Sequence, residues 1–477
     1  MKAKFSKVVS LTTILSMSLL PSLAQPDTTA TLYSYRADLP LVDLHFLRDA
    51  VGMRVNKRSG HKQGLNDVLQ SYESPSMQQA LALTKDLHAA NYYVNNIMWE
   101  KILPLQKNKV WNRVAANTSA ALVDLLFTYK AVVFSPQWLH EEFHRNGLTQ
   151  RGIPSYDETY NIFYGGIANG SISRVRDEDM ARFKKEDSPG MVRSFAAGIE
   201  SEFLLMRELQ KDNFFNKSNY PNIALNVLLT KHAVDYVNQF KRADYNNSID
   251  SMNYYGREVM DRDFVGWDFT AWVYDLHRPF ERYEERGIHP SGTGIDRAIK
   301  TTTLTPEEYQ YLEKMGRMQY LNFLSPFMLG INAVRVNEDT RFNFAVRHYL
   351  NSFGYDLTMD ILLTHKKRSL LMSVHTYRNK YLWLPGIELQ IPAFSIRRHT
   401  AFTFEPRMIL WTQPKAQLFH TKQVQPGMLL GLRTNLAVSR QLQCYVEGEG
   451  KTYGWVAGHP YLKSNLSFRL GLSMDVK

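Results

Sequence analysis

Two histidines in the stretch SPQWLHEEFHRNGLTQ have the spacing of a metal site. His140 and His144 lie four residues apart, so on a helix both imidazoles occupy one face, one turn apart. Two imidazole nitrogens at that spacing can bind one zinc ion at about 2.0–2.1 Å each. Glu141 lies about 100° round the helix from His140, where its carboxylate could take a proton from a water molecule on the metal. The stretch therefore predicts a zinc site with a catalytic base.

The third ligand must come from outside this stretch, because its nearest candidate is unsuitable. Gln150 stands six residues after His144, where a third histidine would complete one known zinc pattern, and glutamine is a poor zinc ligand. The later segment AAGIESEF, predicted to be helical, offers Glu200 and Glu202. Both carboxylates lie in an apolar pattern, where a charge without a partner would be costly.

Glu200 is the preferred third ligand. It shares its helix face with Ala196 and Ala197, small residues that let two helices approach closely. Glu202 shares its face with larger apolar residues, which is more typical of a packed core, and it remains the alternative. Either carboxylate could instead pair with an arginine of the same helix.

Through His140, Glu141, His144 and Glu200 the chain resembles the zincin metallopeptidases, whose signature is HExxH. It is similar in particular to the gluzincins, which take the third zinc ligand from a glutamate on a later helix. The matching residues cover a small part of the chain and identify no named family. The resemblance implies a zincin-like helical core, a zinc cofactor with a bound water, and hydrolysis of a peptide or protein substrate.

A second catalytic group is expected from the segment YDLHRPFERYEERGIHPSGTGIDR. Such hydrolysis needs a hydrogen-bond donor for the oxyanion, and the turn HPSGTG is rich in glycine, so its backbone can approach a ligand closely. We predict His289 in this role, with His277, Tyr283 and Arg297 as further donors of the same segment. The alternative is an ordinary loop histidine.

The periodicity of apolar residues divides the chain near residue 338. Helical spacing is clear over 76–99, 117–144 and 188–210, with a break between Ser135 and Pro136. From residue 339 onward, about eight long runs alternate in the manner of strands. We predict an α+β protein with a mostly helical, zincin-like domain over 25–338 and an antiparallel β domain over 339–477, forming an eight-stranded barrel of the outer-membrane type. A soluble sandwich or sheet is the alternative.

The first residues have the pattern of a secretory signal peptide. A basic start, MKAKFSK, precedes the apolar run VVSLTTILSMSLL, and Ser22 and Ala24 have the spacing that a signal peptidase reads. We predict a signal peptide over 1–24, with a retained anchor as the alternative. The chain has one cysteine, Cys444, so it has no disulfide within the chain. Its net charge of +11 is scattered, which favours a solvated surface or contact with membrane lipid, and no nucleic-acid partner is expected.

These observations predict an exported, membrane-associated zinc hydrolase, most simply a metallopeptidase in which Glu141 activates the water. Its expected location is the outer membrane or periplasm of a Gram-negative bacterium. One alternative is a non-enzymatic outer-membrane protein or scaffold whose metal site is structural or absent. Another keeps zinc hydrolysis but directs it at an amide or ester in lipid or cell-wall material.

Overall fold

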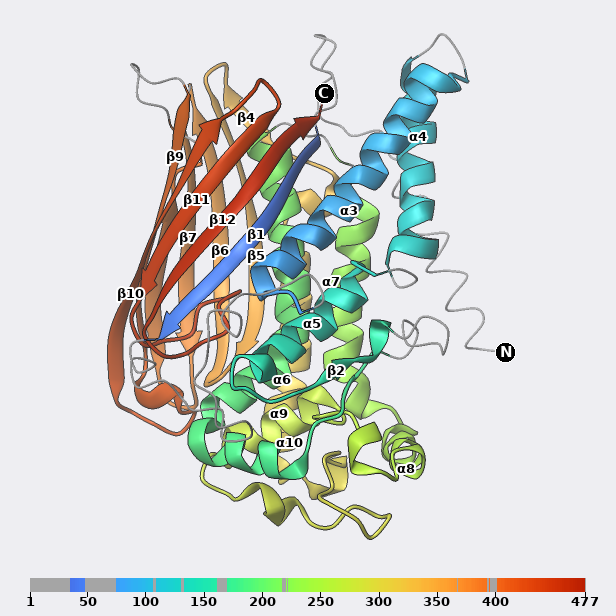
Figure 1. The fold of residues 1–477 in the computed structure, drawn as a ribbon, viewed down its shortest axis with the longest axis vertical. Coiled ribbons are helices and arrows are strands. Elements are labelled where there is room, and N and C mark those ends of the chain that lie inside the picture. Colours follow the sequence, from blue (N-terminus) through green and yellow to red (C-terminus); the bar gives the residue numbers. More distant parts are fainter. Residues whose placement is uncertain are drawn as a thin grey trace.

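A large antiparallel sheet forms one side of the molecule, and helices pack against its inner face and extend beyond it (Figure 1). The computed structural model describes residues 35–47, 74–105, 109–129, 133–160, 170–216, 220, 222–366, 368–392, 394 and 401–476. The predicted signal peptide at 1–24 lies outside the described residues.

The sheet has ten strands in the order β1-β12-β11-β10-β9-β8-β7-β6-β5-β4. The strands are β1 (Tyr35–Leu47), β4 (Val334–Asn337), β5 (Thr340–Asn351), β6 (Gly354–His365), β7 (Arg368–Arg378), β8 (Trp383–Gln390), β9 (Phe402–Pro414), β10 (Val424–Ala437), β11 (Leu442–Lys451) and β12 (Asn465–Val476). Strands from β4 to β12 follow one another along the sheet, as expected for antiparallel neighbours joined by short turns. A separate pair, β2 (Tyr156–Asp157) and β3 (Ile172–Ser173), lies among the helices.

The predicted α+β class is confirmed, but the predicted eight-stranded barrel is wrong. Within the described residues the sheet is open, with β1 and β4 as its two edges. Two of its strands precede the predicted boundary at 338/339, and β1 pairs with β12 in register from Tyr35↔Val476 to Leu47↔Asn465. Helices pack along β1 and against β5.

The helical part contains eight α-helices among the described residues. They are α3 (Met77–Ile97), α4 (Lys109–Val123), α5 (Pro136–Thr149), α6 (Asp177–Phe215), α7 (Ile223–Asn238), α8 (Tyr245–Tyr255), α9 (Asp268–His277) and α10 (Pro306–Met318). Two π-helical turns, η2 (Met98–Ile102) and η3 (Asp124–Thr128), continue α3 and α4. None of the described helices has both the length and the apolar character needed to cross a bilayer.

The helix that carries the two histidines, α5, begins where the sequence predicts a break. Ser135 is its N-cap and accepts a hydrogen bond from the backbone N–H of Trp138 at 3.2 Å, and Pro136 occupies the first turn, where no donor is needed. Trp138 and Phe143 are fully buried and anchor α5 in the core. His140 and His144 lie on the side of α5 that contacts α6, which packs along it.

The longest helix, α6, lies at the centre of the molecule and contacts α3, α5, α7, α9 and strand β5 (Figure 1). Its helical geometry breaks at Asp187, with φ −154° and ψ 63°, just before Pro189. The predicted helix start at Ser188 and Pro189 therefore coincides with this kink, because proline cannot continue the hydrogen-bond ladder of the preceding turn. The segment after the kink carries the residues that approach α5.

The close crossing of α5 and α6 depends on Gly147, which lies inside α5. A Cβ atom on Gly147 would lie 2.3 Å from the hydroxyl oxygen of Ser194 and 3.0 Å from its Cβ. Gly147 thus permits close approach of the helices, and α5 continues beyond it to Thr149.

Replacement of this glycine tests the crossing. Gly147→Ala should lower the free energy of unfolding by about 1–3 kcal/mol, because the added methyl group overpacks the contact with Ser194. Intrinsic helix propensity alone would act in the opposite direction, by about 1 kcal/mol. Urea unfolding followed by circular dichroism gives the sign. The double variant with Ser194→Gly should recover most of the loss; a stabilising Gly147→Ala would contradict the packing.

Candidate metal centre

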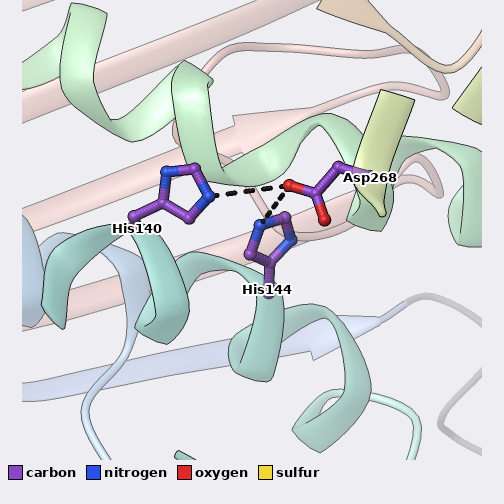
Figure 2. A group of neighbouring side chains, drawn as sticks. All are labelled: His140, His144 and Asp268. Carbon is purple, nitrogen blue, oxygen red and sulfur yellow. Dashed lines mark ion pairs between the residues drawn. The ribbon is translucent and has the colours of Figure 1, made fainter. Parts of the chain in front are cut away.

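The two histidines of α5 meet an aspartate of α9. The Nε2 atoms of His140 and His144 lie 3.6 and 3.2 Å from Oδ2 of Asp268, and Figure 2 shows both rings directed at this one carboxylate. All three ligand atoms lie within 4.8 Å of one another, and all three residues are buried. Two imidazole nitrogens and a carboxylate oxygen are a donor set suited to zinc.

A second contact holds each imidazole ring. The Nδ1 atom of His144 lies 2.7 Å from the carbonyl oxygen of Ser194, and a carbonyl only accepts, so this nitrogen carries the proton. The Nδ1 atom of His140 lies 3.1 Å from Oε1 of Glu202. Burial alone would raise the pKa of Glu202, but the electrostatic interaction with His232 and the hydrogen bonds from His140 and His232 lower it to about 2. With their Nδ1 protons held in this way, both rings turn Nε2 toward Asp268, as metal-binding histidines do.

A positive charge between His140, His144 and Asp268 would stabilise this buried group. Nε2 of His144 and Oδ2 of Asp268 are buried and make no hydrogen bond within the described structure. Burial opposes a charge on His140, yet its interactions with the carboxylates of Asp268 and Glu202 outweigh it and raise the pKa of His140 to about 10. A buried carboxylate among imidazoles is stabilised either by protons on the rings or by a metal cation. The residues present therefore fit a divalent metal ion.

Glu141 lies beside this group rather than in it. Its carboxyl group is buried, and burial is the main cause that raises the pKa of Glu141 to about 7, against the opposing effect of His140 and His144. A Cβ atom on Gly170 would lie 2.6 Å from Oε1 of Glu141. A larger residue at position 170 would therefore displace the carboxylate. The carboxyl group of Glu141, the predicted base, therefore lies close enough to His140, His144 and Asp268 to interact with them electrostatically.

Helix α7 contributes two residues that the sequence did not reveal. His232 bonds Oε1 of Glu202 through its Nδ1 atom at 2.8 Å, and its ring stacks on Tyr236 at 5.5 Å between centroids. Tyr236 also meets the His140 ring edge-on at 5.5 Å. Burial raises the pKa of Tyr236 well above its usual value, and the charges of Asp268 and Glu141 raise it further. The phenol therefore stays protonated beside the site and can donate a hydrogen bond.

The predicted third ligand, Glu200, is not brought to the histidines. Its carboxylate pairs with Arg193 at 2.8 Å and accepts a hydrogen bond from the backbone N–H of Gly458 at 2.7 Å. Glu200 and Glu202 lie two residues apart on α6, about 200° round the helix, so only one of them can face α5. Glu202 faces α5, but it binds His140 as a hydrogen-bond acceptor; Asp268 stands where the third ligand was expected.

The small residue on the face of α6 that contacts His140 is Gly198, rather than Ala196 or Ala197. A Cβ atom there would lie 2.2 Å from Nε2 of His140. Gly198 precedes Glu202 by four residues and shares its face, which is the spacing that could have favoured Glu202 over Glu200. Asp268 left no comparable signal, because an acidic residue in the first turn of a helix is common for its effect on the helix dipole.

The predicted catalytic residue His289 lies in a different environment. Its Nδ1 atom interacts with the hydroxyl and backbone N–H of Ser291 at 3.0 and 3.1 Å, and its backbone N–H donates to Gly294. These contacts fold the turn HPSGTG onto itself. In the described part of the chain the hydrogen bonds of His289 lie within its own turn and join it neither to the two site histidines nor to Asp268. Its neighbour Arg297 pairs with Asp177 at 2.7 Å and likewise supports local structure.

No protein family model matches the chain, and neither the curated proteins nor the solved structures include a match.

Separate substitutions of Asp268 and Glu200 test which of the two is the third metal ligand. In the purified protein, Asp268→Asn should reduce bound zinc from about one equivalent to a small fraction, because an amide replaces the charged oxygen donor. Glu200→Gln should retain the zinc, since that side chain faces Arg193 and Gly458. Metal content by mass spectrometry after dialysis distinguishes them. Loss of zinc in Glu200→Gln with retention in Asp268→Asn would reverse the assignment.

Proposed function

We propose that the protein is a zinc-dependent hydrolase, and specifically a metallopeptidase, whose metal is held by His140, His144 and Asp268. The observation that supports this most is the convergence of the two Nε2 atoms on one buried carboxylate oxygen. The acceptors behind both rings, Glu202 and the Ser194 carbonyl, add to it. Three protein ligands leave the fourth position of a tetrahedral ion for water or substrate, which is the arrangement of catalytic rather than structural zinc sites.

The chemistry divides between the metal and the chain. When bound, zinc supplies a Lewis acid that polarises a carbonyl group and makes a water molecule more acidic. Glu141 then acts as the general base: α5 places it one residue after His140, and Gly170 leaves room for its carboxylate. The same carboxyl group, once protonated, can return the proton to the leaving nitrogen. Glu202 and the Ser194 carbonyl hold the rings in position throughout.

Tyr236 replaces His289 as the proposed donor to the oxyanion. It lies against the His140 ring and within the electrostatic influence of Asp268 and Glu141, whereas the contacts of His289 lie in its own turn. A protonated phenol beside the site can stabilise negative charge that develops on a carbonyl oxygen. Export, and a peptide or protein as substrate, complete the proposal on the basis of the N-terminal pattern and the HExxH resemblance.

Removal of the proposed base should separate binding from catalysis. Glu141→Gln should keep about one equivalent of zinc and lose activity on a mixture of peptides by at least about 10²-fold, the contribution typical of a general base. Including amide and ester substrates from lipid and cell-wall material in the same assay identifies the bond cleaved. If the unaltered protein binds zinc and cleaves none of these substrates, the site is structural and the scaffold alternative holds.

The role of Tyr236 can be tested independently of metal binding. Tyr236→Phe should lower kcat by about 10²–10³-fold with little change in KM or zinc content, because the lost hydrogen bond matters chiefly in the transition state. His289→Ala is the matched comparison and should leave kcat unchanged. A reversed outcome, with His289→Ala inactive and Tyr236→Phe active, would restore the role predicted for His289.

A further inference from the structure

One face of the ten-stranded sheet is apolar across nearly its whole width. A row of directly paired residues crosses six strands from β5 to β10 without a polar side chain. Its members are Val346, Met359, Val374, Ile387, Leu410 and Met428. The adjacent row continues this pattern from Phe344 on β5 through Leu430 on β10 and Leu466 on β12 to Phe46 on β1.

These side chains face outward without any cover in the described structure. Leu430 in the middle of β10 is 50% exposed, and Leu470 in the middle of β12 is 38% exposed. Water-soluble proteins rarely leave a continuous apolar surface of this extent. The face thus needs an apolar environment outside the chain.

The opposite face of the same strands carries the charges. Arg407 pairs with Glu388 at 2.8 Å and with Glu449 at 3.4 Å, and Arg469 pairs with Asp43 at 3.2 Å. This face lies toward α6 and α3 around a polar cavity of about 210 Å³. A soluble sheet directs its apolar side chains to the core and its charges to water, so the pattern here is inverted.

We propose that the apolar face of the sheet lies against the hydrocarbon of a lipid bilayer. The two rows contain no charged side chain and so match hydrocarbon, which cannot solvate charge. The ion pairs of the described strands named above lie on the far side of the sheet. Length agrees as well: β9, β10 and β12 have 13, 14 and 12 residues. At about 3.3 Å per residue and a tilt of about 45°, such strands cross a hydrocarbon layer of about 30 Å. The inference goes beyond the proposed hydrolase and does not depend on it.

Backbone groups at the outer edge of β1 have hydrogen-bond partners that a hydrocarbon environment would not supply. Unpaired backbone groups at a sheet edge are costly in hydrocarbon. Here the N–H of Asp38 donates to the carboxylate of Asp86 at 3.1 Å, and the carbonyl of Pro40 accepts from Gln79 at 3.1 Å. Both partners lie on α3, which packs along β1 (Figure 1). The helix thereby supplies hydrogen bonds that the next strand would otherwise provide.

Apolar exposure continues on the helices beyond this edge. At the connection between α3 and α4, Ile102, Leu103, Val110 and Trp111 are exposed. These helices project past the N-terminal end of β1 in Figure 1. Exposed leucine and tryptophan at such a tip are typical of residues that enter the interfacial region of a membrane.

Site-directed spin labelling of the full chain tests the proposal directly. Cys444 is the only cysteine, so Cys444→Ser gives a background for Leu430→Cys on the apolar face and for Ile288→Cys, a position 77% exposed in the helical part. Each protein is labelled with a nitroxide and reconstituted into phosphatidylcholine–phosphatidylglycerol vesicles. The nitroxide at position 430 should be more accessible to oxygen than to a water-soluble nickel chelate, and the one at 288 should show the reverse.

A second measurement uses the same positions. Leu430→Lys together with Leu470→Lys should lower flotation of the protein with vesicles by about tenfold or more, because lysine on a lipid-facing strand is strongly unfavourable near the bilayer midplane. Ile288→Lys should float like the unaltered chain, and circular dichroism in detergent confirms that each variant folds. Nickel access at position 430 in vesicles would overturn the proposal. So would a water-soluble dimer with spin–spin coupling at position 430, since a second copy would then cover the face.

Discussion

The structure depends on the pairing of the buried charges of α6. A buried charge without a partner costs several kcal/mol, so each such residue fixes the position of whatever pairs with it. Glu202 is held by histidines of α5 and α7. Glu200 accepts a hydrogen bond from Gly458, in the connection between β11 and β12. Arg207 pairs with Glu388 of β8 at 2.9 Å. One helix therefore joins the candidate site to the sheet.

These pairings leave α6 little freedom to rotate or slide. A small rotation would remove Glu202 from His140 and Arg207 from Glu388 together, and two buried charges would lose their partners. Close packing also restricts movement of α6, because a side chain at Gly198 or Gly147 would overlap atoms at the contact between α5 and α6. Such rigidity suits a site in which two ring nitrogens must converge on one carboxylate.

The sequence predicted those parts of the fold and site that lie within one element. The four-residue spacing of His140 and His144, the break before Pro136 and the strand alternation after residue 339 are local patterns, and the structure contains all three. Asp268 could not be found in this way, because its approach to the histidines depends on how α9 packs against α6. The choice between Glu200 and Glu202 failed for a related reason: both faces of α6 are buried, so apolar neighbours on either face carry little information.

The extent of the sheet was likewise beyond local reasoning. Alternation identifies strands but does not say whether the first and last of them meet, and here an early strand, β1, pairs with β12 while β4 remains an edge. The barrel prediction failed at that step. Alternation of polar and apolar residues also does not say which face of a strand points to the helices. A strand with its charges toward the helices and its apolar residues outward has the same period of two as the reverse arrangement.

The pairing of β1 with β12 has a consequence for the order of folding. β1 is the first strand of the sheet along the chain and β12 is the last, so their ladder joins segments separated by nearly all the other elements. A contact of such sequence separation forms slowly, because the intervening chain must first be ordered. During folding α3 can dock on β1 early, because the two are close in sequence, whereas the other side of β1 stays unpaired until β12 is in place. Until then β1 presents an unpaired strand edge, which favours misassociation with other chains.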